Sequence, residues 1–147
     1  MKIAIGCDHG GFQHKNAIAE HLKKRGFEVI DFGIYEEKSV DYPDIAVKLC
    51  ESIVKGENEY GILVCGTGIG MSIAANKIKG IRAAVCSEHF SAKFTRLHND
   101  SNVLCLGGRV IGIGTAIELA DLFVDTPFEG GHHQARLDKI SDIENKN

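Results

Sequence analysis

The stretch YGILVCGTGIGMSIAANKIKG, residues 60–80, indicates the fold of the whole chain. It begins with an apolar run at 60–65, turns through a glycine-rich loop at 66–70 and continues as a helical segment at about 70–78. The apolar run does not alternate with polar residues, which is typical of a strand buried on both faces of a parallel sheet. A strand, a tight turn and a helix in this order form one unit of an α/β domain.

The same alternation extends in both directions from this stretch. Four further apolar runs predict strands, at residues 2–7, 27–32, 81–86 and 102–107. Amphipathic patterns predict further helices at 12–25, 43–55, 89–98, 112–124 and about 132–145. The sequence therefore predicts an α/β fold with a five-stranded parallel sheet, in a single domain over residues 1–147. We expect the first strand to lie between the second and third, which would bring together the loops that follow Cys7 and Cys65.

Composition excludes several classes of protein. The 147 residues are 44% hydrophobic and 25% charged, with a net charge of −3 and no basic block, so binding to nucleic acid or an acidic membrane through bulk charge is not expected. No apolar run approaches the ~18–20 residues that span a bilayer, and the N-terminus lacks a signal-peptide core. We therefore expect a cytoplasmic protein.

The five cysteines suggest neither a disulfide framework nor a structural zinc site, because no C-x-x-C pair occurs. Four of them are expected to be small buried hydrophobes, namely Cys7, Cys50, Cys86 and Cys105.

The loop 66–70 predicts an anion or oxyanion cradle, since glycines allow close backbone approach and a helix start offers free N–H groups. A dinucleotide site is an alternative, and Glu88 lies at about the right distance for a ribose-binding acid. Against it, Met71 stands where the fingerprint needs glycine, and the loop follows the third strand rather than the first. A purely structural turn is the remaining interpretation.

Cys65 stands at the end of a strand, just before this helix start. A helix N-terminus stabilises a thiolate, which acts as a nucleophile or as a base. A base needs an acidic C–H nearby and donors for the resulting oxyanion, and the loop and the Thr67 hydroxyl would supply them. The residues alone leave open whether Cys65 is functional or part of the core.

Two further polar groups are candidates. Asp8 and His9 follow the first strand, where they would form either a helix cap with a surface histidine or a polar clamp for hydroxyls or phosphate. His98 ends a helical segment, a position that favours the imidazolium form of a general acid. A solvated histidine at a helix end is the alternative.

The tail opens a last helix at GGHHQAR, residues 130–136. His132 and Arg136 are four residues apart and share one helix face. His132 and His133 are adjacent and diverge on a helix, so a metal pair is not expected.

At these residues the chain resembles the ribose/galactose isomerase family, to which the type B ribose-5-phosphate isomerases belong. The resemblance runs nearly end to end, and the long segment CGTGIGMSIAANK is its most specific part. The matching stretches are GCDHGGF (6–12), VDYPD (40–44), ILVCGTGIGMSIAANKIKGIRAAVCSE (62–88), HND (98–100), GGRVIG (107–112) and FEGGHHQAR (128–136).

The resemblance implies a Rossmann-like three-layer α/β/α sandwich that interconverts ribose 5-phosphate and ribulose 5-phosphate without a metal or organic cofactor. It implies a homodimer with shared active sites, in which the helix at about 132–145 packs at the interface; the sequence leaves open whether dimers pair into tetramers.

The resemblance also implies roles for single residues. Cys65 would be the base that forms a cis-enediolate, Thr67 and the loop would stabilise it, and His98 would open the sugar ring, together with Asp8. The implied substrate contacts are Asp8, His9, Tyr42, Gly66, Gly68, Ile69, Gly70, Asn99, Arg109, His132 and Arg136.

One position departs from the family pattern, because His132 stands where these enzymes commonly carry arginine. Arginine binds phosphate bidentately and is always charged, so we expect weaker phosphate binding here. An isomerase for allose, allose 6-phosphate or galactose 6-phosphate is therefore an alternative. A non-catalytic module that binds a sugar phosphate or nucleotide is a second one.

Overall fold

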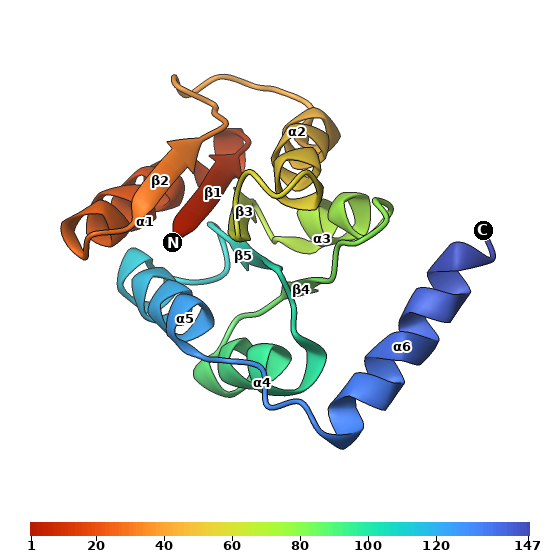
Figure 1. The fold of residues 1–147 in the computed structure, drawn as a ribbon. Coiled ribbons are helices and arrows are strands. Elements are labelled where there is room, and N and C mark those ends of the chain that lie inside the picture. The colour runs from red at the N-terminus through yellow and green to blue at the C-terminus, as the bar shows by residue number, and fades with distance from the viewer.

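One sheet of five parallel strands forms the centre of the computed structural model, which describes all of residues 1–147 (Figure 1). The strands are β1 (Lys2–Cys7), β2 (Glu28–Asp31), β3 (Tyr60–Cys65), β4 (Ala83–Val85) and β5 (Val103–Gly107). Their order is β2-β1-β3-β5-β4, which confirms the predicted place of the first strand. The two edge strands, β2 and β4, are shorter than predicted, since each pairs with one neighbour only.

Helices cover both faces of the sheet. The helices are α1 (Phe12–Lys24), α2 (Tyr42–Val54), α3 (Ile69–Ala75), α4 (His89–Asn99), α5 (Ile113–Asp125) and α6 (His132–Asn145), and a 3-10 turn, η1 (His9–Gly11), precedes α1. Helices α2 and α3 pack on one face, and α1, α5 and α4 pack side by side on the other. The predicted three-layer α/β/α sandwich is confirmed. No helix combines the length and apolar character that crossing a membrane would require.

Helix α6 stands apart from these three layers (blue in Figure 1). It contacts α4 near its own N-terminal end, and Leu137 is its only buried apolar side chain. Ile140 and Ile143, one turn and two turns further along, are exposed. The apolar stripe that predicts this helix is therefore mostly uncovered within one chain.

Continuous burial along the central strands explains their apolar sequences. Every residue of β5 is buried, as is every residue of β3 after Tyr60, which is the pattern of a parallel sheet covered on both faces. Phe123 and Leu119 of α5 pack into the same core.

Three loops meet at the carboxyl edge of the sheet with backbone against backbone. A Cβ atom at Gly10 would lie 2.8 Å from the backbone nitrogen of Gly66, and one at Gly108 would lie 2.2 Å from the carbonyl oxygen of Gly10. A side chain at either position would clash with the backbone of a neighbouring loop. Glycine at positions 10 and 108 therefore lets the loops after β1, β3 and β5 touch. The predicted meeting of the loops after Cys7 and Cys65 is confirmed.

A buried arginine organises the opposite edge. Arg96 is 3% exposed and donates to Asp100 Oδ1 (2.8 Å), to the Ser101 carbonyl (2.7 Å) and to the Tyr60 hydroxyl (2.6 Å). It also donates to the Thr126 carbonyl (3.2 Å). These bonds join the end of α4 to the segment that leads to α6.

Candidate active site

Cys65 ends β3 at the carboxyl edge of the sheet, and its Sγ accepts a hydrogen bond from the backbone N–H of Gly68 at 3.1 Å. Gly68 is the N-cap residue just before α3 and has φ of 81°, in the left-handed region that glycine adopts without strain. The glycine-rich sequence therefore turns the chain sharply enough for a backbone donor to reach the sulfur. Such a donor stabilises a thiolate.

The loop after Cys65 offers further donors. The N–H groups of Gly66, which is partly buried, and of Thr67 make no hydrogen bond within the chain. Thr67 is exposed, and its hydroxyl accepts from the N–H of Ile69 at 3.2 Å. The loop thus has the free donors that an oxyanion site requires.

The loop after β1 adds a carboxylate and an imidazole. Asp8 is buried, and its Oδ1 accepts from the N–H of Gly10 at 2.8 Å. Oδ1 therefore caps the 3-10 turn η1, as one of the two alternatives for Asp8 requires, while Oδ2 makes no hydrogen bond within the chain. His9 is exposed beside it.

Two residues from other elements complete this group. The ring of Tyr42 lies against Gly70, where a Cβ atom would come within 2.6 Å of Tyr42 Cζ. The guanidinium of Arg109 lies across Gly66, with Nη1 3.6 Å from where its Cβ atom would be. Gly66 and Gly70 thus leave room for these two side chains to approach the loop.

The other four cysteines belong to the core, as predicted. Burial raises the pKa of Cys7 to about 11, of Cys50 to about 12 and of Cys86 to about 11. Burial also raises the pKa of Cys105. These thiols stay protonated at neutral pH. Cys65 is also buried, but it stands directly before the glycine-rich loop, and its Sγ accepts from Gly68 of that loop.

Glu88 has a structural role. Its carboxylate accepts from the N–H of Ser91 at 3.1 Å and caps the start of α4. Hydrogen bonding from the side chain of Ser91 and from this N–H lowers the pKa of Glu88. The position that suggested a ribose-binding acid is thus occupied by a helix cap.

The remaining predicted site residues lie elsewhere. His98 and Asn99 end α4, and His132 and Arg136 lie in the first turns of α6. Helix α4 leads to the start of β5, whereas Cys65 pairs with Gly107 at the end of β5. A five-residue strand is ~13 Å long, so one chain holds the two groups at opposite edges of its sheet.

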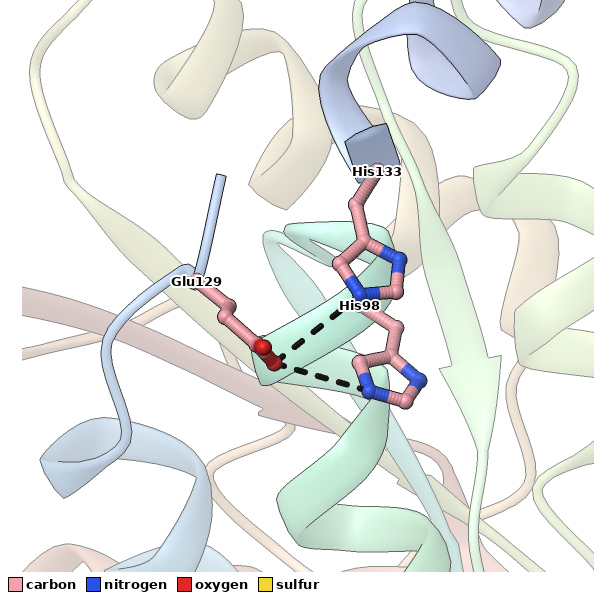
Figure 2. Close-up of side chains that lie close together, drawn as sticks. All are labelled: His98, Glu129 and His133. Carbon is pink, nitrogen blue, oxygen red and sulfur yellow. Dashed lines mark ion pairs between the residues drawn. The ribbon is translucent and has the colours of Figure 1, made fainter. Parts of the chain in front are cut away.

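The second group contains two residues that sequence reasoning missed. Figure 2 shows Glu129 and His133 beside His98. The rings of His98 and His133 stack with centroids 4.1 Å apart, and Glu129 Oε2 lies 3.6 Å from His98 Nε2. Glu129 and His133 are four residues apart, but Glu129 precedes α6, so helical periodicity does not place it.

Parallel α/β sheets bind ligands where their strand order reverses, and the Cys65 loop lies at that point. The chain is thus an α/β/α protein with a polar site at the switch point of its sheet. A family model described as Ribose/Galactose Isomerase matches residues 3–140. The chain belongs to this family.

Individual relatives agree along the whole chain. It is 50% identical to ribose-5-phosphate isomerase B of Escherichia coli over 145 residues, which cover 99% of this chain and 97% of the relative. The ribose-5-phosphate isomerase B structure from Clostridium thermocellum has a TM-score of 0.98 and 53% identity, with 99% of each chain covered. The Mycoplasma genitalium enzyme with bound ribulose-5-phosphate has a TM-score of 0.96 and 40% identity, covering 99% of this chain and 97% of that one.

Proposed function

We propose that this chain is an aldose–ketose isomerase that interconverts ribose 5-phosphate and ribulose 5-phosphate, with Cys65 as the base. The observation that carries the proposal is the sulfur of Cys65 beside the unpaired N–H groups of Gly66 and Thr67. Relatives with this function are 40–53% identical over nearly the whole chain. The rival, a module that only binds a ligand, needs the loop but not the thiol.

The chemistry needs one base and one oxyanion site. The Cys65 thiolate removes the proton from C2 of the open-chain aldose, and the electrons of the C2–H bond form a C1–C2 double bond. The carbonyl oxygen on C1 takes the negative charge, which the N–H groups of Gly66 and Thr67 stabilise. The thiol then returns its proton to C1, and the hydroxyl proton on O2 moves to O1, which completes the ketose.

The remaining contacts of this group bind and orient the sugar phosphate. Asp8 Oδ2 accepts from a sugar hydroxyl, Arg109 binds the anionic end of the substrate, and His9 and Tyr42 make further contacts. These roles use side chains that the fold gathers around the loop.

The second group acts from another copy of this chain. His98 opens the furanose ring, with Asn99, His132 and Arg136 as substrate contacts, and a homodimer brings this group to the Cys65 loop of the other copy. The separation of the two groups along the sheet supports this arrangement. Ile140 and Ile143 on α6 are exposed in one chain, which supports a place for α6 at the dimer interface.

Exchange of the C2 hydrogen of the substrate with solvent tests the proposed role of Cys65. We expect Cys65→Ala to lower kcat/KM for ribose 5-phosphate by ~10²–10⁴-fold, the usual contribution of a general base, and to stop exchange of the C2 hydrogen with D₂O in an NMR assay. Cys50→Ala, which removes a buried thiol outside the site, is the matched control. Undiminished exchange in Cys65→Ala would remove this cysteine from the proposed role.

A further inference from the structure

The side chains of His98, Glu129 and His133 converge from three parts of the chain (Figure 2). His98 comes from the end of α4, Glu129 from the segment before α6, and His133 from the first turn of α6. Glu129 Oε2 lies 3.6 Å from His98 Nε2 and 3.9 Å from His133 Nε2. One ligand atom from each residue lies within 4.8 Å of the other two.

These three side chains make no hydrogen bond within the chain. His133 is notable, since its side chain is only 10% exposed and buried polar groups normally have a partner. Its ring is held between His98 and His132, with centroids 4.1 Å from each. His133 is thus a nearly buried imidazole that faces a carboxylate without a hydrogen bond.

We propose that His98, Glu129 and His133 bind a divalent transition-metal ion such as Zn²⁺. Two imidazole nitrogens and one carboxylate oxygen form a donor set that zinc sites use with a fourth, open position, whereas Ca²⁺ and Mg²⁺ select oxygen ligands. Ligand atoms of a tetrahedral zinc site lie about 3.3 Å apart, given metal–ligand bonds near 2.0–2.1 Å. The distances of 3.6 and 3.9 Å approach this value. The rings of His98 and His133, which stack at 15° to one another, must rotate for both lone pairs to face one ion, and Glu129, whose side chain is 55% exposed, is free to adjust.

The bound ion acts as an inhibitor. Coordination occupies Nε2 of His98, the residue to which the proposed function assigns ring opening, so this consequence rests on that function. The ion takes no part in the proton transfer at Cys65. The proposed reaction uses no metal, yet this site would make the enzyme sensitive to inhibition by a metal ion.

Binding is measured by isothermal titration of Zn²⁺ into tag-free, metal-stripped protein. We use a Cys65→Ser background, because this removes the cysteine that faces the loop. We expect one ion per chain, and at least tenfold weaker binding in both His133→Ala and Glu129→Gln. His89→Ala is the matched control. His89 lies on α4, as His98 does, and forms a similar pair with Glu118 of α5 outside the cluster, so this variant should bind Zn²⁺ as the background does.

Absence of binding, or equal affinity in the background and His133→Ala, would overturn the site; circular dichroism verifies that each variant is folded. The inhibitory role is tested separately with wild-type enzyme and ribose 5-phosphate. Half-inhibition near the dissociation constant supports it, and undiminished turnover at saturating Zn²⁺ overturns it. If the protein shows no isomerase activity without metal, the proposed function fails while the titration still decides the site.

Discussion

Among single residues, His132 is the one that we expect to bear most directly on phosphate binding. It is exposed in the first turn of α6, one turn before Arg136 on the same face. An imidazole that is partly neutral at pH 7 contributes less to phosphate binding than a guanidinium does. If His132 contacts the phosphate as proposed, it would bear on which sugars the enzyme accepts.

We expect His132→Arg to raise kcat/KM for ribose 5-phosphate by roughly 10–100-fold, because a charged hydrogen bond contributes ~1.5–3 kcal/mol. Turnover of unphosphorylated ribose and allose should change little. Steady-state assays with the three sugars measure this preference. An unchanged ratio of phosphorylated to free sugar would show that His132 does not contact the phosphate.

The buried thiols predict how stability depends on pH. In the unfolded chain cysteines ionise near pH 9.0, whereas in the folded chain burial holds the pKa of Cys50 at about 12 and of Cys7 at about 11. A raised folded pKa means that this stability is present below pH 9 and is lost as the pH rises toward 11–12.

Urea unfolding at pH 7.5, 9 and 10.5 measures this effect. We expect the free energy of unfolding to fall over this range, and to fall less in Cys50→Ala than in the wild type. Parallel pH curves for the two proteins would contradict the assignment to Cys50.

At the scale of elements, the sequence predicted strands and helices well where burial is uniform. Strand β3 agrees with its apolar run at both ends, while β2 and β4 are shorter because an apolar run does not reveal which strands lie at the sheet edge. Helix α6 was predicted from its stripe, but its place away from the layers was not. A stripe tells which face is apolar, not what covers it.

The turn between α4 and β5 depends on Arg96. We expect Arg96→Met to lower the free energy of unfolding by ~3–5 kcal/mol, because Asp100 and several carbonyls lose a buried charged partner. Arg25→Met is the control. Arg25 pairs with Asp121 and Asp125 at the surface, and its loss should cost ~0–1 kcal/mol.

Chemical denaturation of both variants gives this comparison, and kcat adds a second measurement. Because Arg96 stabilises the fold next to His98, its loss should also reduce the measured turnover, in proportion to the fraction of the protein that remains folded. Equal losses of stability in the two variants would mean that Arg96 does not anchor the turn.

For the whole molecule, the sequence placed one half of the candidate site but not the other. Parallel topology brings the loops after Cys7, Cys65 and Gly107 to one edge, and this follows from strand order alone. The convergence of Glu129 and His133 on His98 depends on the path of the segment 126–131, which has no periodic pattern. The family resemblance named His98 and Arg136 as site residues, but only the fold shows that they lie far from Cys65.

A mixing experiment tests whether two copies share each site. Cys65→Ala and His98→Asn variants are each expected to be nearly inactive, but a mixed dimer has one site with both residues intact. Equal amounts, unfolded and refolded together, should give about a quarter of wild-type activity, since half of the dimers are mixed and each has one working site of two. Mixing without recovery of activity would indicate that each site is built within one chain.

If two copies share each site as proposed, the separation of the two residue groups would also make catalysis depend on how much protein is present. A lone chain would keep its fold and its thiol, yet have neither ring opening nor a complete phosphate site. Specific activity would then fall on dilution, and at low concentrations the total rate would rise with the square of the amount of chain. For such an enzyme, the rate of its own synthesis sets a threshold below which the pathway it serves receives almost no flux.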